Sequence, residues 1–250
     1  MREKIEKELQ KIETEHEVKI ILAVESGSRA WGFASPDSDY DVRFIYLRKK
    51  EDYLRLDHVR DVIELPIDEE LDINGWDLQK MLRLLYRSNP TVFEWFSSPV
   101  LYRNTALAEE LKEVMKLYFS KKKTLYHYIH MAENNYRGYL MKDMVMAKKY
   151  FYVLRPVLAA KWIFDYGTPP PMEFSQLMKA ELPAELIVEV KDLLDIKINC
   201  PEVKTVPRRD EINKYLEKSI VEIREQTVAM EEYNQNSWDE LNKIFLNSLE

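Results

Sequence analysis

Two aspartates spaced two residues apart are the residues of this sequence best suited to chemistry. Asp39 and Asp41 lie in the stretch Ser-Asp-Tyr-Asp-Val, at the start of an otherwise apolar run. Side chains two apart on a strand point to the same side, so the two carboxylates should converge. Strand interiors disfavour Asp, and carboxylate oxygens are the ligands that Mg²⁺ prefers. The pair therefore predicts a metal site.

A Gly-Ser pair stands about ten residues before the aspartates. Gly27 has no Cβ, so backbone there could come close to a phosphate. If Ser28 begins a helix, its free amides favour an anion. Arg29 is a further candidate for a phosphate contact, although an exposed arginine on a first helical turn is the alternative interpretation. Carboxylates beside a phosphate cradle are what Mg²⁺-assisted nucleotidyl transfer requires.

These motifs resemble those of the DNA polymerase β-like nucleotidyltransferase superfamily. Gly-Ser-Arg-Ala-Trp-Gly-Phe (27–33), followed by Ser-Asp-Tyr-Asp-Val (38–42), is similar to a narrower branch, the RlaP family of nucleotidyltransferases associated with RNA ligases. The resemblance covers about residues 18–166. Its further matches are Asp-Ile-Asn-Gly-Trp (72–76), Ser-Asn-Pro (88–90), Glu-Trp (94–95), Ser-Pro (98–99) and Lys-Tyr-Phe-Tyr-Val-Leu-Arg-Pro (149–156).

The resemblance implies a transferase that moves a nucleoside monophosphate from an NTP to an acceptor hydroxyl. Asp39 and Asp41 would bind two Mg²⁺ ions. A third carboxylate on a neighbouring strand would act on the attacking hydroxyl. Asp72 and Glu64 are both flanked by apolar residues and both fit. Asp72 is preferred because it matches the family motif.

The same resemblance implies that a helical domain closes over the nucleotide. It assigns Lys149, Tyr150 and Arg155 to nucleotide binding, beside Gly27, Ser28 and Arg29 in the phosphate cradle. The family's association with RNA ligases makes an RNA or tRNA end the expected acceptor, and an RNA ligase a candidate partner. A protein hydroxyl, as in toxin-antitoxin-like nucleotidyltransferases, and a catalytically silent nucleotide-binding module are the alternatives.

Charge adds some support for an RNA substrate. The chain has a net charge of −7, so as a whole it does not attract nucleic acid. Residues 121–161, however, hold nine Lys or Arg against two acidic residues. Such a basic segment suits a phosphate-bearing substrate, and a solvated helix face is the alternative.

Composition is ordinary for a globular chain, with 46% hydrophobic and 32% charged residues. One cysteine excludes an internal disulfide framework. The charged start and the lack of a long apolar run favour a cytoplasmic protein with no membrane association.

The pattern of elements predicts an α+β fold in two domains. Residues 1–104 should form a catalytic domain with a mixed sheet, and residues 105–250 a mostly helical domain. Strands are expected at 18–24, 40–47, 62–65 and 71–73. Helices are expected at 2–15, 77–87, from near 91, 105–118, 121–142, 144–166, 173–179, 183–197, 209–235 and 237–248.

Overall fold

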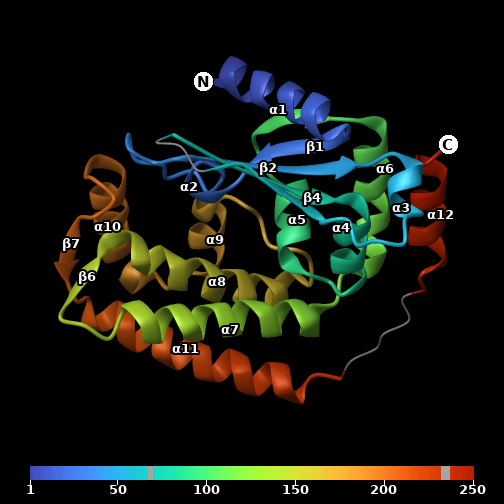
Figure 1. Cartoon of the computed structure of the whole chain (residues 1–250). Helices are drawn as coiled ribbons and strands as arrows, with labels where there is room; N and C mark the ends of the chain where they lie inside the picture. The colour runs from blue at the N-terminus through green and yellow to red at the C-terminus, as the bar shows by residue number, and fades with distance from the viewer. Residues whose placement is uncertain (67–69, 232–236) are drawn as a thin grey trace. The chain divides into compact units, whose positions relative to one another are not determined.

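The computed structural model describes residues 1–66, 70–231 and 237–250, and their contacts form two compact units (Figure 1). Unit 1 contains residues 1–27, 39–66, 70–118 and 237–250, and unit 2 contains residues 28–38 and 119–231. The assignment of a catalytic domain to 1–104 and a helical domain to 105–250 stays a prediction. By contacts, residues 105–118 group with the sheet and residues 28–38 with the helices.

Unit 1 is built on a five-stranded sheet with the strand order β3-β4-β2-β1-β5. Strands β2 and β4 are parallel, and the other neighbouring pairs are antiparallel. The predicted α+β fold with a mixed sheet is confirmed. The strands are β1 (Lys19–Glu25), β2 (Tyr40–Leu47), β3 (Val62–Glu64), β4 (Leu71–Asp77) and β5 (Leu101–Asn104).

One face of this sheet is covered by the N-terminal helix α1 (Arg2–His16), drawn above the strands in Figure 1. Ile5, Leu9 and Ile12 recur at helical spacing, and all three are buried in one cluster with Val42 of β2 and Ile73 of β4. Because side chains alternate along a strand, the neighbours of Val42 on β2 and of Ile73 on β4 must point to the opposite face of the sheet.

On that opposite face, a helix of unit 1 packs at the end of β4 that carries Trp76. The ring of Trp76 on β4 lies 4.0 Å, centroid to centroid, from Trp95 of α5 (Pro90–Phe96). Helix α4 (Leu78–Tyr86) contacts β2 within unit 1. The remaining helices of unit 1 are α3 (Lys50–Tyr53), α4 (Leu78–Tyr86), α5 (Pro90–Phe96), α6 (Ala106–Met115), the 3₁₀ turn Lys116–Tyr118 and α12 (Asp239–Ser248).

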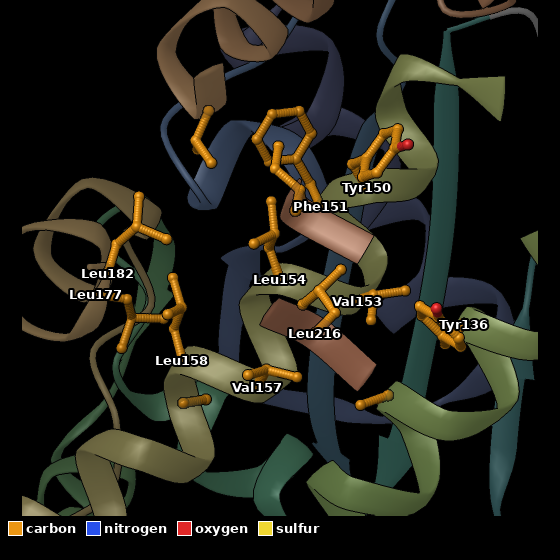
Figure 2. Packing of buried hydrophobic residues seen from close by; sticks show 14 of the residues in the cluster. Tyr136, Tyr150, Phe151, Val153, Leu154, Val157, Leu158, Leu177, Leu182 and Leu216 are labelled. Carbon is orange, nitrogen blue, oxygen red and sulfur yellow. The ribbon is translucent and has the colours of Figure 1, made fainter. Parts of the chain in front are cut away.

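Unit 2 is mainly helical, with one two-stranded sheet. Helix α8 (Ala147–Tyr166) is buried along most of its length. Its Phe151, Leu154 and Leu158 lie in one apolar cluster with Leu177 of α9 (Phe174–Glu181) and Leu216 of α11 (Asp210–Ala229) (Figure 2). The elements are α7 (Lys121–Tyr139), β6 (Met144–Met146), α8 (Ala147–Tyr166), α9 (Phe174–Glu181), the 3₁₀ turn Ala184–Leu186, α10 (Ile187–Asn199), β7 (Thr205–Pro207) and α11 (Asp210–Ala229).

Residues 28–38 are anchored in unit 2 by apolar packing. The ring of Phe33 is buried at centroid distances of 5.0 Å from Phe151 and 5.6 Å from Phe174. The amide of Phe174 also donates to the carbonyl of Trp31 (2.9 Å). The loop between β1 and β2 therefore shares the hydrophobic core of the helical unit.

A polar cluster holds the end of the same loop. Lys197 of α10 is only 4% exposed, and its Nζ donates to Ser35 Oγ (2.8 Å), Ser38 Oγ (3.2 Å) and Glu202 Oε1 (3.0 Å). A buried ammonium is tolerated when it is paired and its protons are hydrogen-bonded, as here. Ser38 directly precedes Asp39 in the chain, so this cluster holds the last residue of unit 2 before the aspartate motif.

Glu202 is the anion at the centre of that cluster. Burial alone would raise the pKa of Glu202, but hydrogen bonds from Lys148 and Lys197 outweigh it and leave this pKa below its ordinary value of 4.5. The stabilisation that comes from the ionised carboxylate is thus present above pH 4.5 and lost as the pH falls through the lowered pKa.

Most predicted elements are present in the described residues. The helix expected at 144–166 is wrong in its first three residues, which form β6 by pairing with β7 about sixty residues later. Strand β4, expected at 71–73, runs on to Asp77 by pairing with β2. A side chain at Gly75 within it would clash with the ring of Phe44, since a Cβ there would lie 2.1 Å from that ring. Residues 232–235 of the helix expected at 209–235 lie outside the described residues.

No helix among the described residues is both long and apolar enough to cross a membrane.

Replacing Lys197 by Met should destabilise unit 2 by about 2–3 kcal/mol at pH 7, because it leaves Glu202 and two buried serines without their shared donor. Calorimetric unfolding measures this loss, which should shrink as the pH falls through the lowered pKa of Glu202. Lys191→Met is the matched control, since Lys191 is exposed on the same helix. Equal unfolding temperatures for the two variants would contradict the role given to the cluster.

Candidate active site

Asp41 and Asp72 lie opposite each other on the two parallel strands of unit 1. The register pairs Asp41 of β2 with Asp72 of β4. Val42 and Ile73, the residues that follow them, are buried under α1, so both aspartates point to the other face. Their side chains are 28% and 29% exposed. Strand pairing thus places two carboxylates side by side where solvent still reaches them.

Arg43 joins the two carboxylates. Its Nη2 lies 2.8 Å from Asp41 Oδ1 and 2.7 Å from Asp72 Oδ2, and its Nη1 donates to the Asp72 carbonyl (2.7 Å). Arg43 is two residues after Asp41 on β2, so it points to the same face. One guanidinium nitrogen shared by two acids marks a position where a cation is strongly favoured.

Gly27 leaves room for Asp41. Its φ is +57°, and a Cβ built on it would lie 1.9 Å from Asp41 Oδ2. Only glycine therefore satisfies both the left-handed backbone and the close approach of the carboxylate. The link between the Gly-Ser pair and the aspartates, expected from their spacing, has this direct physical basis in unit 1.

The backbone of Asp41 is held by the end of β1. Glu25 is 1% exposed and its Oε1 accepts from the Asp41 amide (2.8 Å), while the Ser26 amide donates to the Asp41 carbonyl (2.8 Å). The hydroxyl of Tyr102 donates to the other oxygen of Glu25. The buried Glu25 carboxylate thus accepts the hydrogen bond of the Asp41 amide that a backbone carbonyl would accept if β1 continued.

Sequence reasoning missed Arg43 and Glu25. For Arg43 a signal was present, because a charged residue two positions after Asp41 in an apolar strand repeats the spacing that singled out the aspartates. Glu25 carried no comparable signal, since an acid at the end of a strand is usually solvated.

Asp39 is not gathered with the other two acids. It is exposed and lies one residue before β2 begins, so the strand ladder does not fix its direction. Among the residues that the structure describes, no group of three or more His, Cys, Asp or Glu side chains is arranged to hold a metal ion. The predicted set of Asp39, Asp41 and Asp72 is represented here by a converged pair with Arg43 between them.

Glu64, the alternative third acid, lies one strand further out. It pairs with Asn74 of β4 in the register, so it shares the face of Asp72. Its carboxylate accepts from Asn74 Nδ2 (3.1 Å) and from Arg60. Geometry therefore favours Asp72, which contacts the same guanidinium as Asp41, over Glu64.

The other predicted nucleotide ligands belong to unit 2. Ser28 and Arg29 lie in α2 (Gly27–Ala30), which is too short for a helix dipole to contribute much. Arg29 Nη2 donates to the Ser38 carbonyl (2.7 Å). Ser28 is half-buried, and its carbonyl accepts from the Phe33 amide (3.0 Å). Their roles as phosphate ligands stay predictions.

Lys149, Tyr150 and Arg155 are spread around α8. Lys149 is half-buried and its Nζ lies 4.4 Å from the ring centroid of Tyr152. Tyr150 is fully buried, and its hydroxyl accepts from the Arg209 amide (2.7 Å); burial, as the main cause, raises its pKa. Arg155 is 3% exposed. Their assignment to nucleotide binding stays a prediction.

A family model described as RlaP, RNA repair pathway DNA polymerase beta family, matches residues 1–247. The chain is also 47% identical over 253 residues to an uncharacterized protein, YcgL, of Bacillus subtilis (strain 168), covering 100% of this chain and 97% of that protein.

Among solved structures, the chain is similar to a nucleotidyltransferase-like protein from Exiguobacterium sibiricum 255-15. Identity is 13% and the TM-score 0.30, with 98% of this chain and 89% of the other covered. A likeness this distant supports no argument about the site, so the family match is the informative comparison.

Replacing Gly27 by Ala should lower the unfolding temperature of unit 1, because the methyl group overlaps the Asp41 carboxylate and the left-handed backbone costs about 1–2 kcal/mol more. Gly138→Ala is the control: a Cβ there meets nothing within 4 Å. That helical substitution should stabilise by up to about 1 kcal/mol. Similar effects from both variants, measured by calorimetry, would contradict the packing described here.

Replacing Arg43 by Met should destabilise the metal-free protein, because Asp41 and Asp72 then repel each other without a counter-charge. Mg²⁺ should raise the unfolding temperature of Arg43→Met more than that of the wild type, since it relieves that repulsion on binding. The control is Arg83→Met, an exposed arginine of α4. A Mg²⁺ shift equal in all three proteins would argue against a cation site at these acids.

Proposed function

The chain belongs to the RlaP family of polymerase β-like nucleotidyltransferases, and from this premise we propose that it transfers a nucleoside monophosphate from an NTP to a hydroxyl at an RNA end. The family's description places its members in an RNA repair pathway. The basic segment 121–161, with nine Lys or Arg against two acids, is consistent with a substrate rich in phosphate.

The observation that carries the proposal is the convergence of Asp41 and Asp72 on one nitrogen of Arg43. Carboxylates that share a cation in this way are a suitable donor set for a hard divalent ion. We assign Asp41 and Asp72 as the residues that hold Mg²⁺, joined by Asp39 from the adjoining loop. The bound ions would neutralise charge on the triphosphate and on the attacking oxygen.

The residues of the chain then have defined roles in the reaction. The acceptor oxygen forms a bond to the α-phosphorus of the NTP, and the bond from that phosphorus to the pyrophosphate oxygen breaks. The hydroxyl proton passes to Asp72, the acid on the neighbouring strand. As Asp72 takes the proton, negative charge develops on the pyrophosphate oxygen, and Arg43 provides a donor that can stabilise the phosphate oxygens.

The triphosphate is assigned to the segment that follows β1. Gly27, whose missing side chain leaves room for the Asp41 carboxylate, begins the family motif, and Ser28 and Arg29 come next in it. Lys149, Tyr150 and Arg155 are retained as nucleotide contacts on the family resemblance alone. Because Tyr150 is fully buried, its part would be to support the helix that carries Lys149.

The test is transfer of label from each α-labelled NTP to total RNA in the presence of Mg²⁺. Asp41→Asn and Asp72→Asn should each reduce transfer by at least about 100-fold, the loss expected when a charge or proton acceptor is removed from the reacting centre. Glu64→Gln is the matched control, an acid on the same face of the sheet but one strand away. Its transfer rate should equal that of the wild type.

Other results would change the proposal in distinct ways. Label recovered in a protein instead of RNA would replace the acceptor and keep the chemistry. Nucleotide binding without transfer to any acceptor would mean a silent binding module. Loss of transfer in Glu64→Gln with none in Asp72→Asn would move the third carboxylate to β3.

A further inference from the structure

Unit 2 contains an open pocket of about 200 Å³ that none of the acids described above touches. Met131 and Asn135 of α7 form one wall, and Phe151, Tyr152, Arg155 and Pro156 of α8 form another. Trp31 completes it from the loop 28–38. The whole pocket therefore lies within one compact unit.

A proline inside α8 shapes this pocket. Pro156 has no amide hydrogen, so the carbonyl of Tyr152, four residues earlier, loses its partner within the helix. Asn135 Nδ2 donates to that carbonyl (3.0 Å). This bond fixes the orientation of the Asn135 amide group, and Asn135 is one of the residues that line the pocket. An apolar cavity thus carries one oriented polar group.

The remaining walls are aromatic and lie beside positive charge. The rings of Trp31 and Tyr152 meet edge to face with centroids 6.3 Å apart. The Arg155 guanidinium lies 4.8 Å from the centroid of Trp31, and Lys149 Nζ lies 4.4 Å from that of Tyr152. Aromatic faces with adjacent cations suit a flat ring that carries polar atoms at its edge.

We propose that this pocket binds a nucleobase, an inference that rests on the nucleotidyl transfer proposed above. Pockets that are largely apolar with a few oriented polar groups are typical of small-molecule sites, and stacking on aromatic side chains is how proteins hold bases without reading a duplex. Trp31 is three residues after Ser28 in the same motif. The base belongs either to the NTP or to the end of the acceptor RNA.

The binding test needs neither metal nor triphosphate. Adenosine, guanosine, cytidine and uridine are titrated calorimetrically into the whole protein in EDTA, with ribose 5-phosphate as the ligand that lacks a base. At least one nucleoside should bind, and ribose 5-phosphate should not. Tyr152→Leu should weaken nucleoside binding by about tenfold or more, the effect of one lost base–aromatic stack.

Tyr139→Leu is the matched control, because Lys149 Nζ lies over both tyrosines, at 4.0 Å for Tyr139, and only Tyr152 lines the pocket. Met131→Trp is a second variant that fills the pocket from a side chain 37% exposed, so it guards against misfolding of Tyr152→Leu. Nucleoside binding that is absent in the wild type, or unchanged in Tyr152→Leu and Met131→Trp, would overturn the proposal.

Steady-state transfer then identifies the source of the base. A raised KM for the NTP in Met131→Trp assigns the pocket to the incoming nucleotide, and a raised KM for RNA assigns it to the acceptor. The two measurements separate a failure of the proposed transfer reaction from a failure of the proposed nucleobase pocket. Nucleoside binding without transfer would refute the transfer reaction and leave the pocket. Transfer with unaltered KM values in Met131→Trp would refute the pocket and leave the reaction.

Discussion

Repulsion between two carboxylates is the constraint on which the centre of unit 1 depends. The parallel register of β2 and β4 sets Asp41 beside Asp72, and that register is itself fixed by the apolar residues packed under α1. The two charges are tolerable only with a cation between them. Arg43 supplies one positive charge against two negative charges, so the three side chains together keep a net negative charge.

The loop that leads to this centre is constrained at both of its ends. At its start, Gly27 must remain without a side chain because the Asp41 carboxylate occupies that space. At its end, Ser35 and Ser38 are bonded to the buried Lys197. The residues between them pack into the core of unit 2 through Phe33. Substitutions of Gly27, Phe33, Ser35 or Ser38 should therefore be costly, independently of any role in chemistry.

Much of this arrangement follows from local sequence. The strand 40–47, the α+β class and the pairing of a Gly-Ser turn with Asp41 are all readable from residue type and spacing. Contacts between distant segments are not. Examples are the pairing of β6 with β7, the hydrogen bond from Lys197 to Ser38 and the hydrogen bond from the Asp41 amide to Glu25. The residues joined by these contacts carry no local signal. Asp39 was predicted to share a strand face with Asp41, but β2 begins one residue too late to fix it there.

The most direct test of this account is the binding of Mn²⁺, as a paramagnetic substitute for Mg²⁺, followed by electron paramagnetic resonance with an NTP analogue whose α–β bridge cannot be cleaved. The account predicts that the wild type and Glu64→Gln bind Mn²⁺ with equal affinity, and that Asp41→Asn and Asp72→Asn each bind it at least about tenfold more weakly. Equal affinity in all four proteins would show that the carboxylates around Arg43 are an ion pair of the fold and not the centre of a transfer reaction.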